Sequence, residues 1–225
     1  MNVLAIETAT SGCAVGLLAT TGLELTRVVM GERHHNEVLV QSMSDLLAQA
    51  KVKPQTIDRV VVDHGPGLFT GLRVGIATAI AFAQGVGAEL VEVTSLELLA
   101  HGAWRDGVRG HFDAIVDARR GELFVQSFEL GEGVSATSAP RISRPEDLVA
   151  AWAESGHPRH VGGDGVLRYA PVFSTVGLHV LDDLTIPPVL EALRLGARRH
   201  SVATVTPLYL READAVVNFT TRERS

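Results

Sequence analysis

Residues 72–86 form a predicted helix that is apolar on almost all of its faces, and this most limits how the chain can fold. Between positions 73 and 86 the polar side chains are those of Arg73, Thr78 and Gln84. A helix that is apolar all round must be buried all round, yet in a two-layer unit one side covers a sheet and the other meets water. The second side would then be a large exposed apolar patch, which typically marks a contact with another molecule. We therefore expect a partner protein against this helix, and coverage by a second domain of the same chain is the alternative.

The same helix carries a stripe of small residues at every fourth position, from Gly71 to Gly87. Residues at this spacing share one face of a helix, and their small side chains would let another backbone approach closely. A second helix, predicted over residues 34–50 from its apolar spacing, is expected to join the first in contacting the partner. The predicted partner interface comprises Val38, Leu39, Met43, Leu46, Gly71, Arg73, Val74, Gly75, Ala79 and Ala83.

The order of predicted elements in the first half of the chain indicates its fold class. Three short strands joined by tight turns form an antiparallel meander, and helices then alternate with two further strands. The last helix begins at Ser95, which we expect to be its N-cap. This βββαβαβα order predicts an α/β fold of the ribonuclease-H-like kind, with two subdomains of mixed sheets flanked by helices, as in the actin, Hsp70 and hexokinase superfamily. The predicted strands cover residues 3–6, 14–19, 24–29, 57–62 and 90–93, and the helices cover 34–50, 72–86 and 95–104.

A polar, glycine-containing stretch at residues 105–110 predicts a boundary between two domains. The first domain, residues 1–104, carries the predicted partner interface. The second, residues 105–225, is expected to be a reduced ribonuclease-H-like domain with a tail that frays from Arg211 onward. Its predicted elements are strands over 112–116 and 123–128, a helix over 145–153, a short strand and turn over 159–165, and a helix over 187–200.

Composition excludes several classes of function. A formal net charge of -6 and a pI near 5.8 argue against a free-standing nucleic-acid binder, because phosphate contacts need clustered Lys and Arg. Cys13 is the single cysteine, so no intramolecular disulfide forms, as expected in a reducing cytosol. The N-terminus lacks the basic region of a signal peptide, and no uninterrupted apolar run reaches the ~18 residues that a membrane span requires. We expect a cytoplasmic protein.

The loop before the apolar helix contains three glycines in seven residues, from Gly65 to Gly71. Glycines allow backbone N–H groups to approach an anion closely, and the following helix N-terminus adds partial positive charge. Gly65, Gly67, Thr70 and Gly71 are therefore candidate contacts for an anion or nucleotide. The loop matches neither the P-loop nor the dinucleotide-binding pattern, and a tight strand-to-helix turn is the alternative.

Four motifs, spread in order over nearly the whole chain, resemble those of the bacterial TsaB (YeaZ) family. The glycine loop is the most distinctive of them, although Leu68 stands where the family usually has Ser. The motifs are Ile6-Glu7-Thr8-Ala9-Thr10, Gly65-Pro66-Gly67-Leu68-Phe69-Thr70-Gly71-Leu72-Arg73, Asp117-Ala118-Arg119-Arg120-Gly121-Glu122 and Pro207-Leu208-Tyr209-Leu210-Arg211.

The resemblance implies a non-catalytic partner rather than a catalyst. In this family TsaB pairs with its catalytic paralogue TsaD through the two helices identified above, and the ATPase TsaE joins them. The complex transfers a threonylcarbamoyl group to the adenosine beside the anticodon of ANN-decoding tRNAs, so tRNA would meet this chain only through the complex. Ser95 and Leu99 stand where TsaD has its metal-binding histidine pair. The resemblance thus implies no metal and no cofactor on this chain, and a homodimer is expected when TsaD is absent.

Three other readings remain as alternatives. Glu7 and Asp117 end two predicted strands, as do the Mg²⁺-binding acids of sugar kinases, so a small-molecule kinase is the rival enzyme. A peptidase is disfavoured because Cys13 has no identifiable catalytic partners and no nucleophile-elbow motif is present. A structural metal site is disfavoured because the adjacent His34 and His35 diverge on a helix. Arg119 and Arg120 could reach tRNA phosphates or could simply be solvated.

Overall fold

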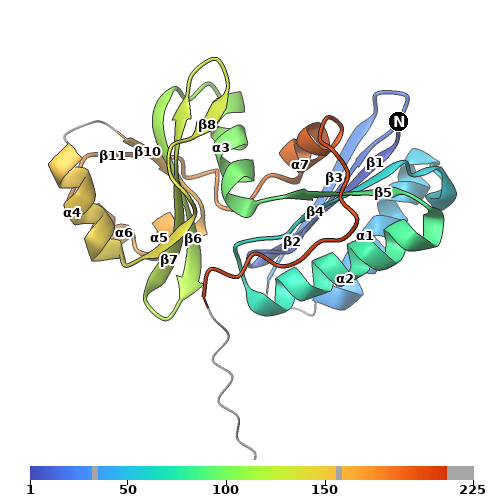
Figure 1. Cartoon of the computed structure of the whole chain (residues 1–225), viewed down its shortest axis with the longest axis horizontal. Helices are drawn as coiled ribbons and strands as arrows, with labels where there is room; N and C mark the ends of the chain where they lie inside the picture. The colour runs from blue at the N-terminus through green and yellow to red at the C-terminus, as the bar shows by residue number, and fades with distance from the viewer. Residues whose placement is uncertain (32–34, 156–158, 212–225) are drawn as a thin grey trace, which may run out of the picture.

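The structure, a computed structural model, describes residues 1–31, 35–155 and 159–211 of the 225-residue chain. Two β-sheets stand side by side, each with its own helices (Figure 1). The first sheet has five strands in the order β3-β2-β1-β4-β5. β1 is antiparallel to β2 and parallel to β4, which confirms the predicted ribonuclease-H-like order. Its strands are β1 (Val3–Glu7), β2 (Gly12–Leu18), β3 (Glu24–Met30), β4 (Arg59–Asp63) and β5 (Glu89–Val93).

The second sheet is also mixed and has six strands. Its order is β11-β10-β6-β7-β8, with β9 also paired to β7. Long antiparallel strands β6 and β7 form a hairpin, and β10 runs parallel to β6. Its strands are β6 (Gly110–Arg119), β7 (Glu122–Leu130), β8 (Val134–Ala136), β9 (Arg141–Ser143), β10 (Arg159–Gly162) and β11 (Leu178–Val180), and its helices are α4 (Pro145–Ser155), α5 (Asp164–Arg168) and α6 (Ala170–Phe173).

Helices cover both faces of the first sheet. α1 (His35–Ala50) and α2 (Phe69–Val86) pack on one face, where Leu39, Ile76 and Ala79 share a buried cluster with the strands. The short 3-10 helix η1 (Pro54–Thr56) follows α1. By length and composition α2 could cross a membrane, but one side of it is buried against the sheet. The helix therefore belongs to the core of the first sheet.

The opposite face of the first sheet is covered by α7 (Val189–Gly196), which comes from the end of the chain. Its Ala192 and Leu193 are fully buried in a cluster with Val3 and Val61. The Arg59 guanidinium of β4 donates to carbonyl groups after α7, including that of Arg199 at 2.8 Å. The predicted division at residue 105 is therefore corrected: the first domain is discontinuous, because its sheet would have a bare face without the C-terminal segment.

Helix α3 (Ser95–Arg105) lies between the two sheets (Figure 1). Leu98 packs in the cluster of the first sheet, whereas Leu96 and Leu99 pack against the second. The N-cap is Thr94, not Ser95 as expected. Its hydroxyl accepts the Glu97 N–H at 3.2 Å, and the Glu97 carboxylate accepts the Thr94 N–H at 2.6 Å.

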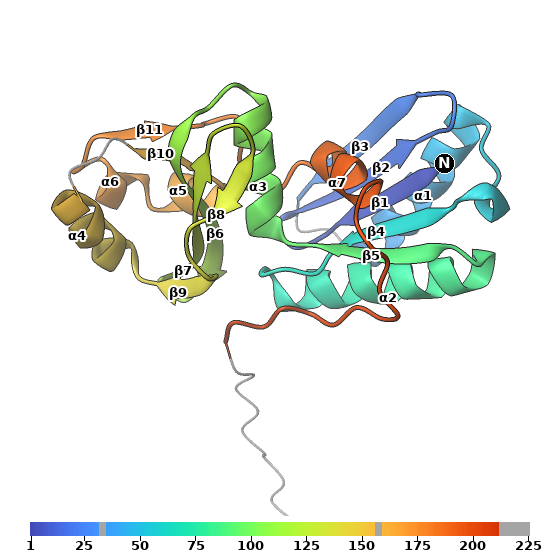
Figure 2. The ribbon, with the colours of Figure 1, turned by 45° about the horizontal axis from the view of Figure 1, so that its top comes forward.

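After α7, residues 201–211 form an extended segment, called the strap below, which follows α2 toward the second sheet (Figure 2). Val202 bridges to Leu90 of β5, and the Leu208 N–H donates to the His64 carbonyl at 2.8 Å. Arg211 at its end bonds to Glu122 of the β6–β7 hairpin. The strap thus connects the two sheets. The expected fraying beyond Arg211 falls outside the described residues.

Candidate functional site

The small-residue stripe of α2 faces the interior of the chain. A Cβ added at Gly75 would lie 2.2 Å from Thr8 Oγ1, and the Thr8 hydroxyl donates to the Gly71 carbonyl at 2.9 Å. Ala79 and Ala83 are buried on the same side. The close approach that small residues permit is therefore used inside the chain, between α2 and the segment that follows β1. The expectation that another subunit meets this stripe is corrected accordingly.

Most of the predicted interface residues are part of the first domain's own core. α1 turns its main apolar face onto the sheet, as α2 does, because that is where a large apolar area can be removed from water. Of the predicted set, Arg73 is exposed and Val38 and Val74 are half-buried. Leu39, Met43, Leu46, Gly71, Gly75, Ala79 and Ala83 are buried.

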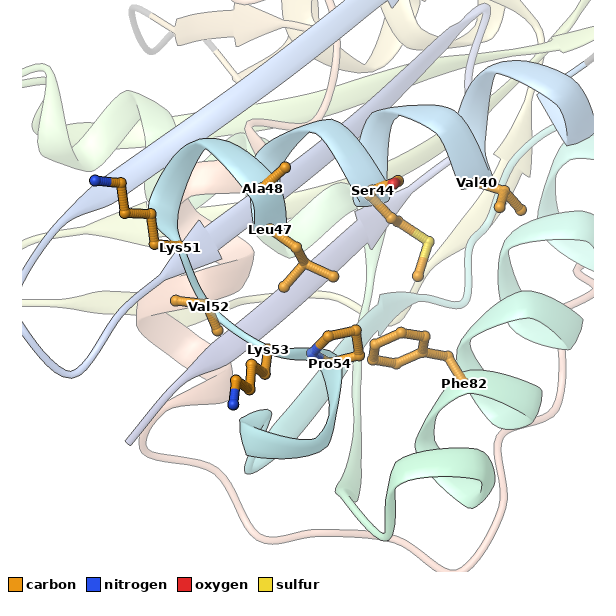
Figure 3. A pocket seen from close by; sticks show the side chains of 10 residues that line it. Val40, Ser44, Leu47, Ala48, Lys51, Val52, Lys53, Pro54 and Phe82 are labelled. Atoms are coloured by element: carbon orange, nitrogen blue, oxygen red, sulfur yellow. The ribbon is translucent and has the colours of Figure 1, made fainter.

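A groove between α1 and α2 is the open apolar surface of this helix pair (Figure 3). Its volume is about 530 Å³. Val40 of α1 is 59% exposed beside it, and Phe82 of α2 lies across from Pro54 (Figure 3). Lys51 and Lys53, the two lysines of the sequence, stand at one end. It is lined by Val40, Met43, Ser44, Leu47, Ala48, Lys51, Val52, Lys53, Pro54 and Phe82.

Sequence reasoning missed most of this lining, although it selected the correct pair of helices. Val40 and Ser44 are exposed on α1, whereas Phe82 is half-buried and packs at the edge of the first domain's core cluster. Phe82, a bulky aromatic residue at the edge of the small-residue stripe and one turn from Ala79, was the available signal. The groove also needs the turn from Lys51 to Pro54, and its closeness to α2 is a tertiary contact that no local pattern encodes.

Two buried carboxyl groups lie at the adjacent ends of β1 and β4. Glu7 and Asp63 are fully buried. Burial, and then the nearby Asp63 charge, holds the pKa of Glu7 well above its usual range. Burial also raises the pKa of Asp63 to about 8, even though its Oδ1 accepts the Gly65 N–H at 2.8 Å and the Ser95 hydroxyl at 2.9 Å. Both carboxyls are therefore held toward the protonated form at neutral pH.

The kinase alternative required Glu7 and Asp117 to face a ligand. Glu7 is buried as described, and Asp117 is 4% exposed. Its Oδ2 lies 3.1 Å from Arg119 Nη1 and 3.3 Å from Arg168 Nε. The neighbouring Asp164 has its pKa raised to about 6, first by burial. The geometry thus gives Asp117 arginine partners and does not present the two acids as an open metal-binding pair.

The glycine loop serves packing more than anion binding. The Gly65 N–H is occupied by Asp63, and a Cβ on Gly67 would lie 2.2 Å from the Ala9 carbonyl oxygen. Gly65 has a φ of +112°, which suits glycine. The predicted anion contact at Gly65 is therefore corrected, and Gly67 has a steric role. Thr70, exposed in the first turn of α2, and Gly71 stay as predicted candidates.

Within residues 1–31, 35–155 and 159–211, no group of three or more His, Cys, Asp or Glu side chains could hold a metal ion. Ser95 and Leu99, which the family resemblance was expected to place at the positions of the paralogue's histidines, are both buried. Ser95 is bonded to Asp63, and Leu99 packs against the second sheet. His34 and the side chain of His35 lie outside what the structure describes.

Comparison with known proteins gives consistent matches along the chain. A family model described as "TsaD: tRNA N6-adenosine threonylcarbamoyltransferase" matches residues 29–181. The tRNA threonylcarbamoyladenosine biosynthesis protein TsaB of Escherichia coli is 28% identical, over 94% of this chain and 95% of that protein. Rv3421c, an uncharacterized protein of Mycobacterium tuberculosis H37Rv, is 33% identical over 71% of this chain and 74% of that protein.

The chain spans different shares of its relatives. ML0378, an uncharacterized protein of Mycobacterium leprae, is 34% identical over 91% of this chain, but the aligned region is only 56% of that protein's length. Among solved structures, YeaZ from Pseudomonas aeruginosa superimposes with a TM-score of 0.80 at 26% identity, over 93% of this chain and 99% of that one.

The strand orders of the two mixed sheets, each flanked by helices, define a protein of the ribonuclease-H-like class. Within that class, the chain belongs to the TsaB (YeaZ) family.

Proposed function

We propose that the chain is a non-catalytic subunit of a complex that modifies tRNA, and that it pairs with a TsaD-type protein through the outer face of α1 and α2. The names of its relatives support the threonylcarbamoyladenosine pathway. The groove between the helices carries the proposal, because an open apolar surface of this kind typically marks a protein contact. A TsaE-type ATPase is the proposed third component, and the cytoplasm the proposed location.

The absence of catalysis on this chain is part of the proposal. Glu7 is fully buried, and Asp117 is paired with Arg119 and Arg168. Neither acid is therefore available to bind a substrate, and this favours an accessory role beside a catalytic paralogue. When the partner is absent, a second copy of the chain is the proposed occupant of the α1–α2 face, because Val40 and Phe82 would otherwise stay in contact with water.

The test changes the outer face of the helices without touching the core. Ala81, exposed on α2, and Ser44, exposed on α1 in the groove lining, are each replaced by Arg. Ala151→Arg, on the exposed face of α4, is the matched control. An unpaired charge buried in an interface is costly, so we expect Ala81→Arg and Ser44→Arg to weaken co-purification with the TsaD-type protein of the same organism by about tenfold or more.

Reconstituted tRNA modification should fall in parallel, while Ala151→Arg stays at wild-type level. Equal partner binding by the Ala81→Arg and Ala151→Arg variants would contradict the proposed interface. Turnover of ATP or a sugar by the pure chain, abolished in Asp117→Asn, would instead support the rival kinase function.

A further inference from the structure

Three segments that are distant in the sequence meet at the junction of the two sheets. They are the start of α2, the turn between β6 and β7, and the end of the strap (Figures 1 and 2). Arg211 connects the strap to the turn through the Glu122 carboxylate and the Ala118 carbonyl. Tyr209, two residues earlier, connects the strap to α2. Through the contacts of Arg211 and Tyr209, the strap brings the turn and the start of α2 together in one surface.

Exposed aromatic rings form the α2 side of this surface. Phe69 and Tyr209 are 47% and 43% exposed, and their rings are stacked with centroids 5.4 Å apart. The Arg73 guanidinium lies 3.7 Å from the centre of the Phe69 ring, and its Nε donates to the Tyr209 hydroxyl at 2.9 Å. The two rings and the guanidinium thus contact one another and remain partly exposed to solvent, whereas rings of this size are usually buried for their area.

Arginines occupy the turn on the other side of the surface. Arg119 and Arg120 are exposed and have φ angles of +62° and +56°, a backbone region in which glycine or asparagine is favoured. The Asp117 carboxylate accepts the Arg119 N–H at 2.9 Å and pairs with its side chain. Local backbone preference therefore does not account for two arginines here, and a strained backbone of this kind often accompanies a binding role.

We propose that this surface, made of Phe69, Arg73, Arg119, Arg120, Tyr209 and Arg211, binds a single-stranded segment of RNA. Stacked aromatic rings recognise the faces of unpaired bases, and guanidinium groups recognise bases and phosphates. A protein partner with acidic side chains would use the arginines but leave the rings without a matching group. The inference rests on the proposed function in tRNA modification, and it locates on this chain one contact with the nucleic acid.

The net charge of -6 is compatible with such a site. It argues against general attraction of nucleic acid to the whole chain, so that binding depends on this local cluster. The surface would contact an exposed loop, because double-stranded RNA presents no unstacked bases. We therefore expect modest affinity of the isolated chain and a clear preference for single-stranded over duplex RNA.

The experiment measures binding of the full chain to a fluorescein-labelled hairpin RNA with a single-stranded loop, by anisotropy at low salt. Tyr209→Ala should raise the Kd by about tenfold, since base stacking on an aromatic side chain is lost. Arg119→Ala combined with Arg120→Ala should also raise the Kd and make the slope of log K against log salt less steep, because positive charge near the phosphates is lost. Arg198→Ala, an exposed arginine elsewhere, is the control.

Tyr209→Phe keeps the ring and should keep most of the affinity, and thermal unfolding of each variant verifies its fold. The proposal fails if Tyr209→Ala and the double variant bind like Arg198→Ala, or if duplex RNA binds as well as the hairpin. It also fails if the isolated chain shows no saturable binding below about 100 µM, the weak end of non-specific affinity.

Co-purification with the TsaD-type protein separates this inference from the proposed function. Variants that lose the partner but bind RNA normally would make the surface a protein contact and overturn the inference. A chain that binds the hairpin as described but never pairs with a TsaD-type protein would support the RNA site and contradict the proposed function.

Discussion

At the scale of single residues, the core of the first domain contains a destabilising feature. Asp63 is fully buried, and its pKa is raised to about 8, chiefly by burial. A carboxyl whose folded pKa exceeds its unfolded value favours folding most at low pH, where it is protonated in both states. That contribution is lost as pH rises from about 3.8 toward about 8, because the unfolded chain releases a proton that the folded chain retains.

Asp63→Asn should remove this dependence. Asparagine can still accept the Gly65 N–H and the Ser95 hydroxyl through its carbonyl oxygen. The free energy of unfolding of the variant relative to wild type should therefore rise between pH 4 and pH 8, by on the order of a few kcal/mol. Urea unfolding at both pH values, with the exposed Asp182→Asn as control, measures the change. A difference that is the same at pH 4 and pH 8 would show that Asp63 ionises normally in the folded chain.

Some residue roles could be predicted from the sequence and others could not. Thr94 and Glu97 stand three apart before an apolar run, which is the signature of a capping box, so the true N-cap of α3 was available in the sequence. The bond from Ser95 to Asp63 joins residues 32 apart. It depends on the packing of α3 against the end of β4, which no local pattern specifies.

At the scale of elements, α2 was predicted correctly as a helix but not in its orientation. Small residues at every fourth position define a face, and the sequence alone does not say whether that face meets a sheet of the same chain or another subunit. In the structure this face meets the same chain, because the Thr8 side chain fills the space that Gly75 leaves. The succession of strands along the first domain was predictable because turns and β-branched runs mark each strand locally.

Two glycines of α2 should respond in opposite ways to the same substitution. Gly75→Ala should lower the free energy of unfolding by about 1–3 kcal/mol, because the added methyl group overpacks a buried site against Thr8, which is itself held by Gly71. Gly85→Ala adds a methyl group in open space and should stabilise the helix by about 0.5–1 kcal/mol. Chemical denaturation measures both, and stabilisation by Gly75→Ala would contradict the packing described.

At the scale of the whole molecule, the two ends of the chain build the first domain together. The sequence showed an amphipathic helix near residue 190 but not the sheet that it covers, and the polar stretch at 105–110 suggested a simple division. Val3, Ala5 and Val61 are fully buried beneath α7. A division by sequence position cannot represent a domain that the chain leaves and re-enters.

Residues 1–104 on their own should therefore fail to fold cooperatively, because the face of the sheet that α7 covers would be exposed to water. Thermal unfolding followed by circular dichroism should show no sharp transition for this fragment. Adding a separate peptide of residues 185–211 should restore part of the transition, and the same peptide with Leu193→Asp serves as the control. A fragment 1–104 that unfolds as sharply as the whole chain would contradict the discontinuous domain.

The return of α7 to the first sheet also sets an order of events during synthesis. Domains commonly fold as units while the chain leaves the ribosome, N-terminal parts first. Here the strands of the second sheet lie between residues 110 and 180, so all of them have emerged before α7 becomes available. The second sheet can therefore form while one face of the first sheet is still uncovered. The part of this protein that is translated first is therefore the part that is completed last.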